Sequence, residues 1–201
     1  MERETQRVIN YFVFKGRKLK APNDVLLTAA RCVLANIPRK CWSSVWRYYP
    51  SECPAKNILM DYVDNLDQHR KDGKGLFIFG RTRRGKTSAA TLIAKEVIRR
   101  DGFPLFVPCA HIPRIECSAD SEDVELSQKM RHITFLILDD LGADSGRDKA
   151  AAMIEQVIRD RDNQMLPTIV TTNLDETKLE KEFGLPMLEL LLETCIAVPF
   201  K

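Results

Sequence analysis

The apolar positions of the chain gather into five short runs, each bounded by glycine, proline or charged residues. Runs that are apolar at consecutive positions, and rich in branched or aromatic residues, are typical of strands covered on both faces. Two of the runs lead directly into polar side chains, which a buried strand presents only at its end. The pattern predicts strands at residues 76–79, 104–108, 135–138, 166–172 and 195–200.

Segments with helical spacing, in which apolar residues recur three or four positions apart, separate these strands. Residues 88–100 are largely apolar, end in two arginines and stop at Asp101-Gly102, as a buried helix with a glycine stop should. Residues 121–131 are expected to form a short helix that begins with acidic residues, and Asp144-Ser145 is expected to cap the helix that follows it. Residues 187–192 are expected to form an apolar turn before the last strand.

The alternation of strands and helices predicts an α/β fold with a doubly wound, mainly parallel five-stranded sheet. A strand–helix–strand unit of this length closes right-handed, so strand 104–108 is expected to pair in parallel with strand 76–79. The polar residues that end two of the strands are expected at the carboxyl edge of the sheet, where ligands bind in open α/β folds.

The residues before the first strand predict a helical and aromatic connector. Asp24 opens a helix over 24–34 that Pro38 stops, and residues 56–70 form an amphipathic helix with its aspartates facing out. Between them lie Trp42, Trp46, Tyr48 and Tyr49, which we expect to pack on the main domain; the alternative is stacking on nucleic-acid bases or on an adenine. The predicted organisation is an N-terminal arm at 1–23, this connector at 24–74 packed on the core, and a core at 75–201 without a separate C-terminal lid.

The composition is that of an ordinary globular protein, with 201 residues of which 44% are hydrophobic and 29% charged. No apolar run approaches the length of a membrane helix, and the first residues lead into no signal-peptide core, so a cytoplasmic location is expected. The six cysteines are scattered without a C-x-x-C pair, which favours buried free thiols over a zinc site or a disulfide framework. The net charge of +3 is too small to indicate nucleic-acid binding by itself.

A glycine-bounded loop follows the first strand and leads into a helix. Its sequence, Gly-Arg-Thr-Arg-Arg-Gly-Lys-Thr at 80–87, matches the phosphate-binding pattern G-x-x-x-x-G-K-S/T. Such a loop aims backbone N–H groups at a polyphosphate, while Lys86 adds a cation and Thr87 offers a hydroxyl to Mg²⁺. The pattern predicts that a nucleoside triphosphate with Mg²⁺ binds to Gly80, Arg81, Thr82, Arg83, Arg84, Gly85, Lys86, Thr87 and Ser88.

Three arginines make this loop unusually cationic: Arg81, Arg83 and Arg84. Many such loops carry a third glycine at the position of Arg83, so the backbone here is expected to be stiffer. The added charge has four candidate partners, namely phosphate, a neighbouring subunit, nucleic acid or only solvent, and solvent is the default for exposed arginines.

Two carboxylates and an amide end the strands that follow the loop. Asp139 and Asp140 end strand 135–138 about fifty residues after the loop, where Asp139 is expected to hold Mg²⁺ through water and Asp140 to orient or deprotonate an attacking water. Asn173 ends strand 166–172 and is expected either to bond that water or the terminal phosphate, or to cap a helix beginning at Leu174. The predicted catalytic residues are Lys86, Asp139, Asp140 and Asn173, and the predicted metal ligands are Thr87 and Asp139.

Together these motifs resemble those of the DnaC/DnaI-type helicase loaders and the related IstB-type transposition ATPases, which belong to the AAA+ class of P-loop NTPases. The resemblance is carried by residues 36–39, 80–87, 138–142 and 167–174 and by the helix before Gly75. It implies ATP-driven or ATP-switched remodelling on DNA by oligomers that grip a replicative helicase or a transposase. It also implies that Asn173 senses the terminal phosphate, and it points to residues 108–114 for single-stranded DNA.

The sequence lacks two arginines that members of this family usually carry. Family members usually carry one in the segment that matches 182–192, where it reaches the neighbouring subunit's nucleotide, and another just beyond the last strand; neither is found here. Since such an arginine contributes about a thousandfold or more to turnover in other nucleotide hydrolases, slow hydrolysis is expected. The alternatives are a nucleotide-gated binding module without turnover and a small-molecule kinase, although no arginine-rich lid follows the third strand.

Overall fold

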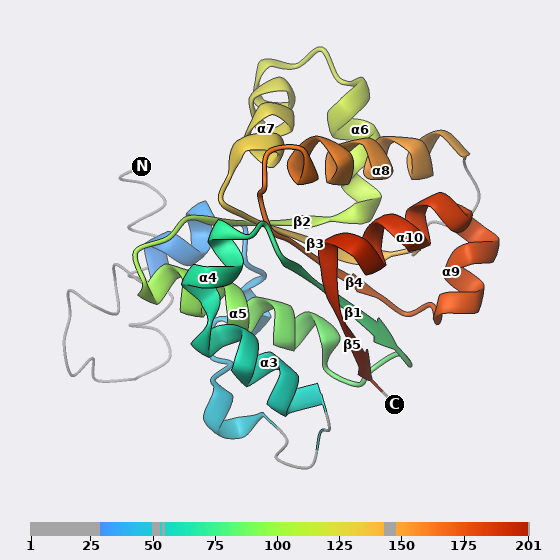
Figure 1. The fold of residues 1–201 in the computed structure, drawn as a ribbon. Coiled ribbons are helices and arrows are strands. Elements are labelled where there is room, and N and C mark those ends of the chain that lie inside the picture. The colour runs from blue at the N-terminus through green and yellow to red at the C-terminus, as the bar shows by residue number, and fades with distance from the viewer. Residues whose placement is uncertain (1–28, 50–52, 54, 143–147, 201) are drawn as a thin grey trace.

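A five-stranded, fully parallel sheet forms the centre of the computed structural model, which describes residues 29–49, 53, 55–142 and 148–200 (Figure 1). The strand order is β2-β3-β4-β1-β5. The predicted doubly wound α/β sheet is therefore confirmed, and its topology is that of P-loop NTPases. The strands are β1 (Gly75–Gly80), β2 (Pro104–Pro108), β3 (Phe135–Leu141), β4 (Thr168–Thr172) and β5 (Cys195–Phe200).

The expected pairing of β2 with β1 is wrong. Strand β2 pairs with β3 at one edge of the sheet, whereas β1 lies between β4 and β5. Helix α5 (Lys86–Arg99) makes the connection by crossing the sheet, in contact with β4, β3 and β2 in turn. Proline at both ends of β2 suits an edge strand, because proline donates no ladder hydrogen bond. The backbone N–H of Phe106 donates instead to the carbonyl oxygen of Ala35, 2.8 Å away, in the described part of the connector.

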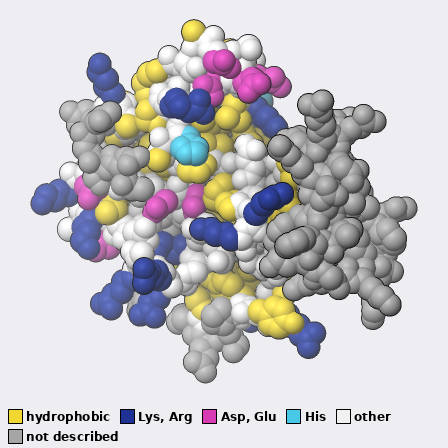
Figure 2. Space-filling model, turned by 180° about the vertical axis from the view of Figure 1, so that it is seen from behind, with side chains coloured by type: hydrophobic (Ala, Val, Ile, Leu, Met, Phe, Trp, Pro, Cys, Tyr) yellow, Lys and Arg dark blue, Asp and Glu magenta, His cyan; other side chains and the backbone are white. Residues whose placement is uncertain are grey.

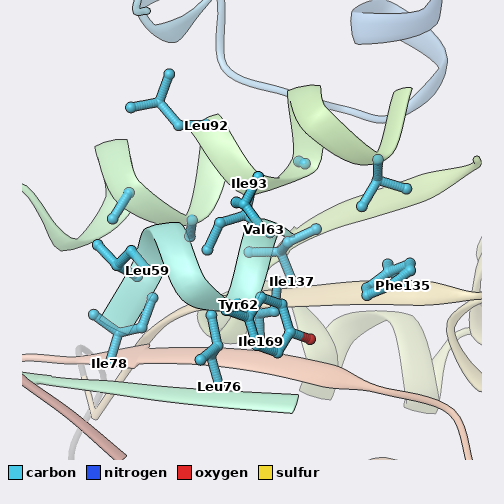
Figure 3. Close-up of a cluster of buried hydrophobic side chains, with 14 of the residues drawn as sticks. Leu59, Tyr62, Val63, Leu76, Ile78, Leu92, Ile93, Phe135, Ile137 and Ile169 are labelled. Carbon is cyan, nitrogen blue, oxygen red and sulfur yellow. The ribbon is translucent and has the colours of Figure 1, made fainter. Parts of the chain in front are cut away.

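Helices cover both faces of the sheet (Figure 1). Alternate residues of each strand point to opposite faces, so the core divides into two clusters. One holds Leu76, Ile78 and Ile137 under α5 and α3 (Ala55–Asp64), as Figure 3 shows. The other packs the opposite face against five helices, which are α6 (Ile112–Cys117), α7 (Ser121–His132), α8 (Asp148–Asp162), α9 (Glu176–Phe183) and α10 (Leu185–Thr194).

Three expectations for the helices need correction. The segment 56–70 forms two helices, α3 and α4 (Leu66–Lys71), and Asn65 separates them. Residues 109–117 form the 3₁₀ turn η3 (Cys109–His111) and α6, where the sequence showed no regular spacing. Residues 187–192 lie inside helix α10 rather than in a turn, because Gly184 turns the chain at φ +82° and Pro186 starts a new helix. The helix at 121–131 and the last strand are confirmed.

The described part of the connector packs on α5. Residues 29–34 are helical, and η1 (Arg39–Cys41) and η2 (Trp46–Tyr48) follow. The ammonium of Lys95 on α5 donates to the carbonyl oxygens of Trp42, at 3.0 Å, and of Ser44. The arm at 1–23, the start of helix 24–34 and the Asp144-Ser145 cap lie outside the described residues, and the bounds of the three predicted segments stay predictions.

Two further expectations concern the state of the cysteines and the presence of membrane-spanning helices. All six cysteines are free, and four of them are buried, while Cys53 is half-buried and Cys117 is exposed. Among the described helices, none combines the length and the apolar character needed to cross a bilayer.

Candidate nucleotide site

The loop between β1 and α5 has the backbone of a phosphate-binding turn. Gly80 and Gly85 adopt positive φ angles of 131° and 94°. A Cβ atom on Gly80 would lie 1.9 Å from the carbonyl oxygen of Phe200, so only glycine fits there. Arg83 also has a positive φ, of 62°, which costs an L-residue on the order of 1 kcal/mol. The loop therefore holds a strained arginine where a glycine would be relaxed.

Lys86 begins α5 and is 6% exposed. Its ammonium donates to the carbonyl oxygens of Gly80 (2.8 Å) and Arg81 (2.7 Å) and to Oδ1 of Asn173 (2.7 Å). Burial lowers the pKa of Lys86, and the charges of Asp140 and Asp139 oppose that shift. These bonds hold the cation at the carboxyl end of β1, between the loop and the polar residue that follows β4.

Thr87 and Asp139 form the candidate metal ligands. The Thr87 hydroxyl donates to Oδ1 of Asp139 at 2.8 Å, and the Thr171 hydroxyl donates to the same oxygen at 2.7 Å. Burial raises the pKa of Asp139, and the two hydroxyl bonds lower it. A hydroxyl and a carboxylate side by side suit Mg²⁺, which prefers oxygen ligands and takes others from phosphate and water. The donor set therefore fits the predicted ion.

Asp140 lies in an irregular part of β3. Its φ is +61°, and the register with β4 shifts between Leu138 and Leu141, as in a β-bulge. The Asp140 N–H donates to the Thr171 hydroxyl oxygen at 2.9 Å, which holds this strained backbone in place. Bulges of this kind re-aim a side chain, and here the carboxylate meets Asn173, whose Nδ2 donates to Oδ1 of Asp140 at 2.6 Å.

Asn173 therefore joins the two halves of the site, because its oxygen accepts from Lys86 and its nitrogen donates to Asp140. The alternative that Asn173 caps the next helix is wrong. The N-cap of α9 is Asp175, whose side chain accepts the Lys178 N–H at 2.9 Å.

The structure brings the four predicted catalytic residues and Thr87 together at one edge of the sheet. The other predicted nucleotide contacts lie around them: Arg81, Thr82, Arg83 and Arg84 are exposed, and Ser88 is in the first turn of α5. Seen from behind, Lys and Arg side chains gather at the lower left, the side toward which the strands point (Figure 2). In the region suggested for single-stranded DNA, His111 and Arg114 are exposed, and Arg114 pairs with Asp123 at 2.6 Å.

Two contacts of the site were missed from the sequence. Thr171 bonds both acidic residues, and its only sequence signal is that it precedes Asn173 in a strand that ends at the same edge. Tyr49 is 7% exposed, and its hydroxyl donates to the carbonyl oxygen of Gly85 at 3.4 Å, so an aromatic residue of the connector packs on the phosphate loop. No local pattern indicates that contact, because 36 residues separate the two positions.

Comparison with known proteins supports the family resemblance. No protein-family model matches the chain. The chain is 28% identical over 141 residues to the replicative helicase loader DnaI of Bacillus subtilis, a match that takes in 67% of this chain and 44% of that protein. The chain thus spans less than half the length of this curated relative.

Solved structures of replication proteins share the fold. A crystal structure of the DnaC helicase loader superposes with a TM-score of 0.73 and 22% identity, covering 82% of this chain and 100% of that one. A crystal structure of DnaI gives 0.70 and 20%, covering 82% and 95%. The replication initiator DnaA, bound to AMPPCP and single-stranded DNA, gives 0.64 and 16%, covering 77% and 48%. The predicted resemblance to DnaC/DnaI-type proteins is confirmed, and the fold is that of P-loop NTPases.

Proposed function

We propose that the chain binds ATP with Mg²⁺ at the carboxyl edge of the sheet, hydrolyses it slowly, and acts as a helicase-loader-like AAA+ protein in DNA replication. The observation that carries the proposal is the set of hydrogen bonds that joins Lys86 to Asn173, Asn173 to Asp140, and Thr87 to Asp139. Three separate segments of the chain supply these residues, and an arrangement of this kind is what polyphosphate chemistry needs.

Each residue has a role that follows from its position. The loop N–H groups and the Lys86 ammonium bind and orient the β- and γ-phosphates, and Thr87 with Asp139 hold Mg²⁺, which neutralises phosphate charge when bound. Asp140 orients the attacking water and accepts its proton. Asn173 positions Asp140 and the Lys86 ammonium at the same time, so it couples the attacking side of the site to the phosphate side.

Slow turnover is part of the proposal. Residues 182–192, which the structure describes, contain no arginine that could reach the nucleotide bound by a neighbouring copy. This absence favours a second candidate function, a nucleotide-gated binding module in which ATP changes affinity for a partner without useful hydrolysis. The two candidates share the binding site and differ only in whether Asp140 acts on water.

The proposed partner is a replicative helicase, since the relative of known function is a loader of one. A transposase of the kind served by IstB-type ATPases is the alternative partner, and self-association and binding of single-stranded DNA are further parts of the proposal. Co-purification of the tagged protein from its host tests the partner: recovery of the replicative helicase is expected, and recovery of a transposase without the helicase would contradict that choice.

Steady-state ATP hydrolysis by the wild type and by Asp140→Asn, with and without single-stranded DNA, separates enzyme from binding module. We expect slow turnover that falls at least about a hundredfold in Asp140→Asn, with ATP affinity retained, because only the water-activating carboxylate changes. Asp64→Asn, an exposed carboxylate on α3, is the matched control and should hydrolyse ATP like the wild type. Absence of Asp140-dependent turnover under every condition would leave the binding module.

A further inference from the structure

A cleft of about 560 Å³ opens beside the phosphate loop. Residues from four parts of the fold line it: the loop, the end of β4, the start of α9 and the end of β5. They include two cations, Arg81 and Lys178, and Lys178 pairs with Asp175, which also lines the cleft. The lining residues are Gly80, Arg81, Asn173, Asp175, Lys178 and Phe200.

The inner end of this cleft coincides with the surroundings of the Lys86 ammonium. The three acceptors of that ammonium belong to Gly80, Arg81 and Asn173, and the same three residues line the cleft. In a phosphate loop, the lysine reaches the β- and γ-phosphates. The terminal phosphate of a bound triphosphate would therefore lie in this cleft, which other side chains also line.

Lys178 lines the same cleft from the first turn of α9. Its ammonium lies 3.2 Å from Oδ2 of Asp175, and the two side chains are 63% and 54% exposed. Exposed pairs of this kind contribute at most about 1 kcal/mol, so a phosphate can replace the carboxylate as the partner of the ammonium. The four-carbon stem of lysine permits that exchange without movement of the backbone.

The backbone that carries Lys178 is well anchored. The Leu174 N–H donates to the Thr172 hydroxyl at 3.1 Å, the Asp175 carboxylate caps α9, and Leu179 is fully buried under the helix. Asn173 and Lys178 are thus carried by an anchored stretch of backbone, and both line the cleft.

We propose that Lys178 contacts the terminal phosphate of ATP from within the same chain and lets the site distinguish ATP from ADP. This inference rests on the proposed function, because it assumes that ATP occupies the loop. ADP lacks the terminal phosphate, so a cation placed beside that group stabilises the ATP complex alone. Lys178 acts as a positioning and specificity residue, and its charge comes from the chain that binds the nucleotide rather than from a neighbouring subunit.

The test compares the affinities for ATP and ADP, measured with Mg²⁺ by displacement of a fluorescent nucleotide. Lys178→Ala should weaken ATP binding about fivefold while ADP binding stays within about twofold, as expected for one exposed charge pair. Lys178→Arg should retain the wild-type ratio because it keeps the charge. Lys181→Ala is the matched control, since Lys181 is exposed on the same helix but does not line the cleft.

Three results would overturn the proposal. Unchanged affinity for ATP in Lys178→Ala would show that the ammonium does not meet the terminal phosphate. Equal weakening of both nucleotides, or the same effect in Lys181→Ala, would indicate a structural or long-range effect instead. A wild type that binds neither nucleotide would remove the proposed function itself, whereas wild-type binding with an unchanged ratio removes only the role of Lys178.

Discussion

Each edge of the sheet holds one buried cation, and the two are bound in different ways. At the carboxyl edge, Lys86 donates to two loop carbonyls and to the Asn173 side chain. At the amino edge, Arg161 of α8 is fully buried and donates to the Thr168 hydroxyl and to the carbonyl oxygens of Met130, Ile133, Thr134 and Pro167. Burial lowers the pKa of both side chains, that of Arg161 to about 9.

The difference lies in what the partners can do. The planar fork of Arg161 is filled by groups that are fixed in the backbone or in β4, so it joins the end of α7 to the starts of β3 and β4. Lys86 shares Asn173 with Asp140 beside an exposed rim, where a phosphate can take over its bonds. A buried cation with saturated, fixed partners serves the fold, whereas the exchangeable partners of Lys86 are consistent with the proposed ligand site.

Backbone strain follows the same division. Asn36, Asp101 and Met165 have positive φ angles, but each lies in the turn that ends a helix, and its N–H donates to one of the last carbonyl oxygens of that helix. Arg83 and Asp140 have positive φ angles without any such helix end. Strain without a capping role is therefore confined, among the described residues, to the carboxyl edge.

The largest expected effect is at the amino edge. Arg161→Met should lower the free energy of unfolding by about 3–5 kcal/mol, because several buried carbonyl oxygens lose their donor. Arg159→Met is the control: Arg159 is on the same helix, is 45% exposed and pairs only with Glu155, so it should cost under about 0.5 kcal/mol. Chemical denaturation measures both. A loss below about 1 kcal/mol for Arg161→Met would contradict the structural role of this arginine.

The next effect is at the carboxyl edge. Thr171→Val removes a donor to Asp139 and the acceptor of the Asp140 N–H, so Mg²⁺-dependent nucleotide binding should weaken about tenfold. The hydrogen bond from Thr171 lowers the pKa of Asp139, so its loss should raise that pKa further. Because Mg²⁺ binds the ionised carboxylate, nucleotide binding with Mg²⁺ should then require a higher pH. Thr172→Val is the control, since Thr172 is equally buried in β4 but bonds only backbone groups; it should reduce stability without changing metal dependence.

A smaller effect is expected from relief of strain in the loop. Arg83→Gly should raise stability by up to about 1 kcal/mol, because glycine adopts a φ of +62° without the Cβ clash. Arg84→Gly, at a neighbouring loop position with negative φ, should instead lower it by about 0.5–1 kcal/mol. Thermal unfolding of the two variants reports the difference. Equal destabilisation by both substitutions would show that Arg83 is not strained.

The smallest effect concerns His69, which precedes β1 at the amino edge. Its ring stacks on Tyr62 at 4.4 Å, its Nε2 is buried without a hydrogen-bond partner, and burial lowers its pKa below the usual 6.5. The unfolded chain then binds more protons, so stability is fully present above pH 6.5 and declines as the pH falls below that value. His69→Phe should keep the stacking and lose less stability than the wild type between pH 7 and 5.5.

The control for this pH dependence is His132→Phe, at an exposed histidine whose Nδ1 lies 3.0 Å from the Gln164 side chain. Its pH dependence should match that of the wild type. If His69→Phe and the wild type lose the same stability on acidification, another group is responsible for the decline.

The sequence predicted the elements whose character depends on local pattern. The strands that carry the loop, the two acids and Asn173 are buried runs of apolar and β-branched residues, and they lie where the pattern placed them. The neighbour of β2 in the sheet could not be predicted in this way, because a strand that is apolar on both faces carries no information about which strand it pairs with. The bulge at Asp140 was equally invisible, since it depends on the register with β4.

Long-range contacts account for the rest. Arg161 follows a helical pattern in which a charged residue is normally exposed, and only the carbonyls that converge on it in the folded chain explain its burial. The contact of Tyr49 with Gly85 also arises from the way the connector lies along α5. The placement of the motif residues at one edge of the sheet was thus predictable from the sequence, whereas the residues that position them depend on the tertiary structure.

The account depends most directly on Lys86. Titration of a fluorescent ATP analogue with Mg²⁺ into the wild type and Lys86→Ala, with thermal unfolding in parallel, tests whether the carboxyl edge is a nucleotide site. We predict saturable binding by the wild type, binding at least about a hundredfold weaker in Lys86→Ala, and nearly equal thermal stability, since the lost bonds serve a ligand rather than the fold. Equal affinity of the two proteins for the analogue would contradict the assignment.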